Sequence, residues 1–155
     1  MANRAPVRTE SDVTALLNSA GHVLSNRLAA GLEGIGLTPR MQCVLVHALE
    51  EERTQIQLAA LADLDKTTMV GTVDDLEKHG LAERRPSATD RRARVIAVTD
   101  KGRAAAQAGQ RIVDGIHAEV LDRITGDRGG FVAALNALAG EAPAPERPIR
   151  RRRDR

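Results

Sequence analysis

The feature that most constrains the fold is a change in the spacing of apolar residues after His79-Gly80. Before that point apolar side chains recur every three or four residues, which is the period of an amphipathic helix. After it come two short segments typical of strands, 81–85 and 94–98, joined by the turn-rich, basic segment PSATDRR. The sequence therefore predicts a mainly helical domain that contains one small β-hairpin.

Capping residues divide the helical part into separate helices. We expect long helices over 11–33 and 100–124 and shorter ones over 39–50, 55–62, 66–78 and 128–138, in the order α-α-α-α-β-β-α-α. The expected N-caps are Ser11, Thr38, Thr54, Asp65 and Thr99. Gln57 completes a capping box with Thr54, and Gly80 ends the helix before the hairpin. The expected buried faces of the second and fourth helices are Met41, Val44, Leu45 and Ala48, and Met69, Val73 and Leu76.

Length and composition exclude several classes of protein. The 155 residues suit one domain with tails, and we expect residues 1–10 to be flexible and the Pro- and Arg-rich residues 140–155 to be disordered. Phe131 is the only Phe, Tyr or Trp residue, which argues against a single-strand binder that stacks bases. One cysteine excludes an internal disulfide and a cysteine-built zinc site. No apolar run has the roughly 18 residues of a membrane span. We expect a cytoplasmic protein without a membrane partner.

The order of elements and the placement of charge point to DNA. Two short helices across a tight turn, followed by a basic hairpin, form a winged helix-turn-helix. The second of those helices, 66–78, is expected to read the major groove, with free N–H groups at its N-terminus facing phosphate. Arginines at the hairpin tip are expected to enter the minor groove or to follow the backbone.

This part of the chain resembles the MarR family of winged-helix transcriptional regulators, and the resemblance extends over about residues 11–139. The residues that carry it are Leu37-Thr38-Pro39, Gln42, Leu45, Thr54-Gln55, Leu58-Ala59, Leu64-Asp65-Lys66-Thr67-Thr68, Val73-Asp74, Leu76-Glu77, Gly80-Leu81, Arg84, Asp90-Arg91-Arg92-Ala93, Val98-Thr99 and Gly102. The resemblance implies an intertwined homodimer with a winged helix over 37–98 and dimerisation helices over 11–33 and 100–139. It also implies a repressor that binds a palindromic operator and is released by a small molecule.

We expect DNA contacts from the reading helix, the hairpin and the start of the preceding helix. The residues are Gln55, Lys66, Thr67, Thr68, Val70, Gly71, Thr72, Arg84, Arg85, Asp90, Arg91 and Arg92. Arg84 and Arg85 have two open readings, a contact with the DNA backbone or a pairing with acidic residues. Gly71 and Asp75 depart from the family, which often has basic residues there, so the reading helix is poor in cations.

The remaining predictions concern ligands. Relatives bind small, often anionic aromatic molecules beside the dimer helices, so His22, Arg27, Arg40 and His47 are candidates for binding an anionic or phenolic effector. Cys43, four residues before His47, is a candidate redox thiol. No metal site, cofactor or enzymatic activity is expected, because no nucleophile, base and oxyanion donor assemble.

Three alternatives to an effector-controlled regulator stay open. Gly71 and Asp75 are consistent with a protein-interaction module whose DNA reading is weakened. The arginines of the tail are consistent with a protein that compacts DNA without sequence choice. Cys43 is consistent with a regulator that responds to oxidants.

Overall fold

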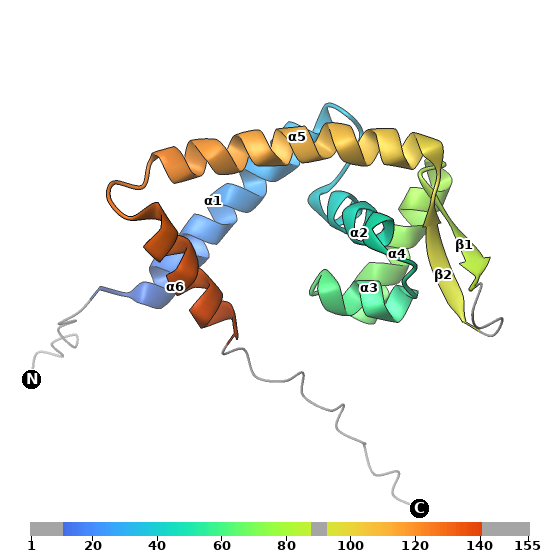
Figure 1. Cartoon of the computed structure of the whole chain (residues 1–155), viewed down its shortest axis with the longest axis horizontal. Coiled ribbons are helices and arrows are strands. Elements are labelled where there is room, and N and C mark those ends of the chain that lie inside the picture. Colours follow the sequence, from blue (N-terminus) through green and yellow to red (C-terminus); the bar gives the residue numbers. More distant parts are fainter. Residues whose placement is uncertain (1–10, 88–92, 141–155) are drawn as a thin grey trace, which may run out of the picture. The chain divides into compact units, whose positions relative to one another are not determined.

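The computed structural model describes residues 11–87 and 93–140, so the predictions for the two termini and the hairpin tip lie outside the described residues. Within them the predicted order of elements, four helices, a hairpin and two helices, is confirmed (Figure 1). The helices are α1 (Val13–Glu33), α2 (Pro39–Glu50), α3 (Gln55–Leu61), α4 (Lys66–Lys78), α5 (Asp100–Asp122) and α6 (Arg128–Gly140). The strands are β1 (Ala82–Pro86) and β2 (Arg94–Val98).

The chain divides into two compact units, Met1–His117 and Ala118–Arg155. The first holds α1 to α4, the hairpin and most of α5, and the winged helix lies entirely within it. The second holds the end of α5 and all of α6. In the second unit the Asp127 carboxylate accepts a hydrogen bond of 3.0 Å from the Gly130 N–H, so it caps the first turn of α6.

Local capping explains where the helices around the turn begin and end. Thr38 caps α2, and the capping box of Thr54 and Gln57 starts α3 with both of its hydrogen bonds present. Asp65 caps α4, and Gly80 follows that helix with φ of +68°, a conformation that favours glycine. Each of these assignments was predicted, because each depends on residues within three or four positions of one another.

The start of α1 differs from the prediction. Asp12, not Ser11, is the N-cap, and its carboxylate accepts a 2.9 Å hydrogen bond from the Ala15 N–H. Both residue types favour this position, so the sequence alone did not separate them. The long helix also ends at Asp122, two residues earlier than expected.

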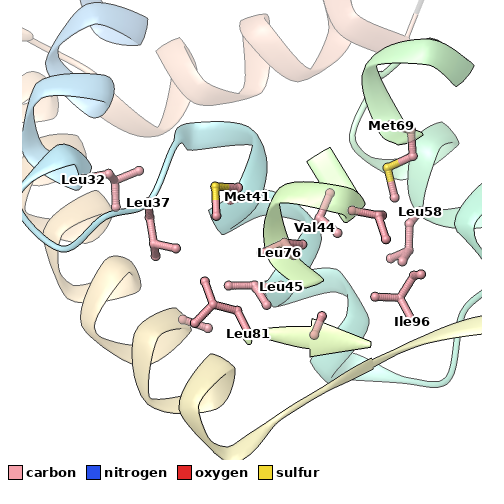
Figure 2. Packing of buried hydrophobic residues seen from close by; sticks show 13 residues of the cluster. Leu32, Leu37, Met41, Val44, Leu45, Leu58, Met69, Leu76, Leu81 and Ile96 are labelled. Carbon is pink, nitrogen blue, oxygen red and sulfur yellow. The ribbon is translucent and has the colours of Figure 1, made fainter. Parts of the chain in front are cut away.

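One apolar cluster joins the elements of the first unit (Figure 2). The buried faces predicted for α2 and α4 are confirmed, except that Ala48 is partly exposed. The end of α1, the hairpin and α5 complete the cluster. Its members are Leu32, Leu37, Met41, Val44, Leu45, Leu58, Met69, Val73, Leu76, Leu81, Ala82, Ile96 and Ala106. The buried face of α4 therefore packs against apolar residues from several other elements.

The loop between α2 and α3 pairs with the outer strand of the hairpin, in the position of a third strand. β1 and β2 pair antiparallel, from Ala82 opposite Val98 to Pro86 opposite Arg94. On the outer side of β2 the Ile96 N–H donates to the Arg53 carbonyl at 3.1 Å, and Val95 forms a bridge with Thr54. The wing strands are thus attached to the start of α3.

The first turn of α5 is attached to the start of β1. The Thr99 N–H donates to the Leu81 carbonyl at 3.0 Å, and the Thr99 hydroxyl accepts a 3.0 Å bond from the Gly102 N–H, which confirms Thr99 as the cap of this helix. Gly102 is buried against Leu81. The packing is so close that an added Cβ on Gly102 would lie 1.9 Å from the Leu81 carbonyl oxygen.

Candidate nucleic-acid interface

Helix α4 presents a polar, exposed face on the side opposite its buried stripe. Lys66, Thr67 and Gly71 are exposed, and Val70 is 37% exposed. These four are among the residues predicted to contact DNA, and they lie within the first two turns of the helix. Because Met69, Val73 and Leu76 are buried, the exposed face is held at a fixed angle to the core.

The N-terminus of α4 differs from the expectation that its N–H groups are free. The Asp65 carboxylate accepts hydrogen bonds from the Thr67 N–H at 2.9 Å and the Thr68 N–H at 3.0 Å. The Thr68 hydroxyl also donates to Asp65, at 2.5 Å. These bonds hold the pKa of the Asp65 carboxyl below its ordinary value. The cap therefore satisfies two of the N–H donors that we expected to face phosphate, and it places a negative charge beside them.

The prediction that Thr72 lies on the exposed face is wrong. Its side chain is buried, with 7% of the residue exposed, and its hydroxyl donates to the Thr68 carbonyl at 2.8 Å. A threonine in a helix satisfies its hydroxyl in this way when its face packs against a neighbouring element. Thr72 therefore belongs to the packed side of the reading helix.

The two arginines of β1 have different surroundings. Arg84 is half-buried and forms ion pairs with Asp74 and Glu77 of α4, while its Nε donates to the side-chain amide oxygen of Gln55 at 3.3 Å. Arg85 is exposed and pairs with Glu83 of the same strand. The sequence left open whether Arg84 and Arg85 pair with acidic residues, and in the structure both of them do. Gln55 is half-buried at the first position of α3.

The hairpin tip, with the predicted contacts Asp90, Arg91 and Arg92, lies outside the described residues. Ser87, the last described residue before the tip, is fixed by hydrogen bonds. The buried Ser87 hydroxyl donates to the Glu52 carboxylate at 2.6 Å, and the Ser87 N–H donates to the Ala93 carbonyl at 3.0 Å.

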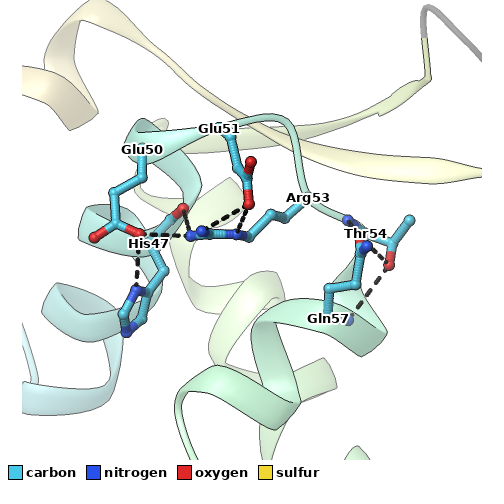
Figure 3. A network of polar contacts seen from close by, with 6 residues as sticks. All are labelled: His47, Glu50, Glu51, Arg53, Thr54 and Gln57. Carbon is cyan, nitrogen blue, oxygen red and sulfur yellow. Dashed lines mark hydrogen bonds and ion pairs between the residues drawn. The ribbon is translucent and has the colours of Figure 1, made fainter.

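A polar network braces the turn between α2 and α3 (Figure 3). The Arg53 guanidinium donates to the His47 carbonyl at 2.6 Å, to Glu50 at 2.7 Å and to Glu51 at 2.9 Å. Hydrogen bonds from Arg53 and His47 hold the pKa of the Glu50 carboxyl below its ordinary value. Because the Arg53 carbonyl also accepts from β2, this network connects the end of α2 to the wing. The acidic run at 50–52 predicted only that α2 ends there.

The four candidate effector residues do not converge in the described part of the chain. His22 and Arg40 are exposed, Arg27 is partly buried, and His47 contacts Glu50 at 3.3 Å. Two open grooves are present, and none of these four residues lines either of them. One, of about 510 Å³, is lined by Ala29, Ala30, Glu33, Gly36, Leu37, Thr38 and Pro39. The other, of about 320 Å³, is lined by Val46, Leu49, Glu50, Ala106, Gln107 and Gln110.

Gln42 is a buried polar residue whose place the periodicity did not predict. Only 4% of it is exposed, and its amide nitrogen donates to the Ala106 carbonyl of α5 at 3.0 Å. Its amide oxygen is buried without a hydrogen-bond partner among the described residues. That oxygen lies against Gly109, where an added Cβ would be 2.1 Å away. The sequence signal that could have indicated a buried Gln42 is its place between Met41 and Val44, two apolar residues of the buried face of α2.

Cys43 is partly buried on α2. Burial raises the pKa of its thiol, and the negative charge of Glu50 adds to the increase. The His47 imidazole contacts Glu50. These surroundings favour the protonated, unreactive thiol over the thiolate that redox sensing requires.

We therefore expect Cys43 to react slowly in the folded protein. At pH 8 its alkylation by iodoacetamide should be at least about tenfold slower in buffer than in denaturing urea, since a raised pKa and burial both reduce the accessible thiolate. Mass spectrometry of quenched samples gives both rates. A faster reaction in the folded protein would instead support the reading of Cys43 as a redox thiol.

Residues 11–87 and 93–140 hold neither a cluster of metal ligands nor a membrane-spanning helix. No group of three or more His, Cys, Asp or Glu side chains is placed to hold a metal ion there. None of the described helices is long and apolar enough to cross a membrane.

Comparison with known proteins places this arrangement in a family. The model of the MarR family matches residues 35–93, which span α2, α3, α4 and most of the wing. The structure of CouR from Rhodococcus jostii RHA1 bound to p-coumaroyl-CoA is 30% identical, with a TM-score of 0.76 over 83% of this chain and 90% of that chain. CouR bound to a 23-mer DNA duplex is similar at 28% identity, with a TM-score of 0.71 and the same coverage.

A third structure extends the likeness to another organism. A MarR family protein of Mycobacterium tuberculosis in complex with salicylic acid is 26% identical, with a TM-score of 0.68 over 85% of this chain and 99% of that chain. The chain belongs to the MarR family of winged-helix transcriptional regulators.

Proposed function

We propose that the protein represses transcription by binding a palindromic DNA operator as a homodimer. The observation that carries this proposal is the exposed face of α4, where Lys66, Thr67, Val70 and Gly71 lie opposite a fully buried stripe. A helix held in this way is suited to the major groove, where a threonine hydroxyl and a valine methyl group can contact base edges. CouR, a relative with 28% identity, is bound to a DNA duplex in its structure.

The wing supplies the positive charge that α4 lacks. We place Arg91 and Arg92 at the minor groove, with Asp90 bracing one of them by a charge-assisted hydrogen bond. Helix α4 itself carries the exposed carboxylates Asp74 and Asp75, so we expect fewer phosphate contacts from this helix than from a basic one.

Exposed apolar residues on the helices outside the winged helix support the homodimer. On α1, Val13 is 58% exposed and Leu16 is 61% exposed, and on α6 Phe131 and Leu138 are 38% and 52% exposed. Apolar surface of this kind is unfavourable in a free monomer, and a two-fold symmetric interface would cover it. In this proposal the helices at 11–33 and 100–139 form the interface, and the winged helix at 37–98 binds DNA.

We further propose that a small anionic aromatic acid or its thioester releases the protein from DNA. CouR is bound to p-coumaroyl-CoA and the mycobacterial relative to salicylic acid in their structures. His22, Arg27, Arg40 and His47 stay the candidate partners of the negative charge, each from α1 or α2. Release requires that the effector binds the DNA-incompetent conformation more tightly.

A footprint on the DNA that flanks the gene, at two salt concentrations, tests the DNA-binding proposal. We expect an inverted repeat protected by the wild type. The variant Arg91→Ala/Arg92→Ala should lose affinity by about tenfold or more and show a shallower dependence on salt, because each phosphate contact contributes about 0.9 to the slope.

The matched control is Arg111→Ala/Arg123→Ala, which removes the same charge from two exposed positions, one in α5 and one directly after its end. It should keep the wild-type footprint, provided that size-exclusion chromatography shows an unchanged oligomer. Absence of protection by the wild type at either salt would contradict the proposal and favour the protein-interaction module. Unspecific protection lost on truncation after Gly140 would favour DNA compaction by the tail.

A further inference from the structure

Arg84 of β1 connects that strand to the two helices of the helix-turn-helix, α3 and α4. Its side chain leaves the middle of β1 and is 28% exposed. One terminal nitrogen of the guanidinium pairs with Glu77 of α4, and the other lies 2.7 Å from the Asp74 carboxylate. The third nitrogen, Nε, donates to the side-chain amide oxygen of Gln55, the first residue of α3, at 3.3 Å. All three nitrogens therefore have an acceptor.

The backbone adds a fourth bond to the same cluster. The Arg84 N–H donates to the Glu77 carboxylate at 2.8 Å, so Glu77 binds both the main chain and the side chain of one residue. A guanidinium is a rigid, planar fork, and donors fixed to several acceptors define an orientation that a single point charge cannot. The wing strand and the reading helix are thus held at one angle.

The neighbouring Arg85 shows what an unconstrained arginine of this strand looks like. Its side chain is 64% exposed, and among the described residues it pairs with Glu83, two residues away on the same strand. It ties no second element to β1. Arg85 can reorient toward a phosphate at little cost, whereas Arg84 would have to leave two carboxylates to do so.

The partners of Arg84 also matter for the charge of α4. Asp74 lies one helical turn after Gly71, on the exposed side, and its side chain is 59% exposed. An uncompensated carboxylate there would repel the DNA backbone. Paired with Arg84, Asp74 and Glu77 instead become the anchor points of the wing.

We propose that Arg84 is a positioning residue that sets the angle between the wing and the reading helix, and thereby the discrimination of operator from other DNA, without contacting DNA itself. The proposal rests on the proposed function and selects one of the two readings that the sequence left open for this arginine. It assigns direct contact to Arg85 and to the hairpin tip.

Arg84→Gln and its neighbour Arg85→Gln form a matched pair, because each removes one positive charge from adjacent positions. Fluorescence anisotropy gives the Kd for the footprinted operator and for a scrambled duplex of the same length, over a range of salt. For Arg84→Gln we expect the ratio of operator to scrambled-duplex affinity to fall by about tenfold and the salt slope to stay unchanged, while the uncompensated carboxylates of Asp74 and Glu77 lower both affinities to the same small extent. For Arg85→Gln we expect both affinities to fall together and the slope to decrease by about 0.9.

Substitution of the acidic partners tests whether Arg84 positions the wing or contacts DNA, because the two roles predict different ratios of operator to scrambled-duplex affinity. If Arg84 acts through them, Asp74→Asn/Glu77→Gln should lower the ratio of operator to scrambled affinity as Arg84→Gln does, although removing negative charge tightens binding to every duplex. Adding Arg84→Gln to that variant should cause no further loss of the ratio. If Arg84 contacts DNA, freeing it from the acids should leave this ratio unchanged or raise it.

Arg84→Lys separates charge from geometry. A lysine keeps the charge but cannot hold three acceptors in one plane, so we expect it to behave as Arg84→Gln. Full rescue by lysine, a ratio of operator to scrambled affinity that Asp74→Asn/Glu77→Gln does not lower, or a salt slope lowered in Arg84→Gln would each overturn the proposal. A wild type without any footprint would overturn the proposed function and this inference together, whereas a normal wild-type footprint with an unchanged ratio in Arg84→Gln overturns this inference alone.

Discussion

Gly102→Ala should destabilise the protein by about 3 kcal/mol, although the same change in an exposed helix is stabilising by up to about 1 kcal/mol. The new Cβ would lie 1.9 Å from the Leu81 carbonyl oxygen and 2.8 Å from a methyl group of Val98. The carbonyl cannot easily retreat, because it accepts the hydrogen bond of the Thr99 N–H at 3.0 Å. Relief therefore requires α5 to move away from the wing.

Urea unfolding followed by circular dichroism measures this loss, at one fixed protein concentration because we expect a dimer. Gly71→Ala is the matched control. Gly71 is also helical, is exposed and has no atom within 4 Å of an added Cβ, so its replacement should leave stability unchanged or raise it. A Gly102→Ala variant as stable as the wild type would show that α5 and the hairpin do not pack as described.

Leu58→Ala should cost about 2–5 kcal/mol of the free energy of unfolding, the range for deleting a buried leucine side chain. Leu58 is fully buried and is the only buried residue of α3, a helix of seven residues. The short helix has few other apolar contacts with which to close the cavity. Because α3 packs against α4, we also expect weaker operator binding.

Ile56→Ala is the control on the same helix. Ile56 is 83% exposed, so its truncation should change stability by no more than about 0.5 kcal/mol. The same urea titration compares the two variants. Equal losses at Leu58 and Ile56 would contradict the orientation of α3 that the structure shows.

The order of elements could be predicted from the sequence because its signals are local. Thr38, Thr54 and Asp65 act on N–H groups two or three residues further along the chain. Gly80 takes up a positive φ that side chains disfavour. The buried faces of α2 and α4 repeat with the helical period, so they too were predicted. The sequence did not distinguish Ser11 from Asp12 as the N-cap of α1, because both residue types suit that position.

The candidate interface was predicted in outline, since the exposed residues of α4 follow from the position of its buried stripe. The individual roles were not all predictable. Thr72 lies at the border of that stripe, where the packing angle decides whether a side chain is inside or outside. The occupied N-terminus of α4 was implicit in its cap, because Asp65 can satisfy the same N–H groups that a phosphate would use.

By itself the sequence determined the helices, the hairpin and their order, because those depend on neighbours a few positions apart. Only the tertiary structure decided how polar side chains pair across the fold. Arg84 meets Gln55 from 29 positions away, and Gln42 meets the Ala106 carbonyl from 64 positions away. Such pairs depend on the angle and distance at which two elements pack, and no local spacing encodes those quantities.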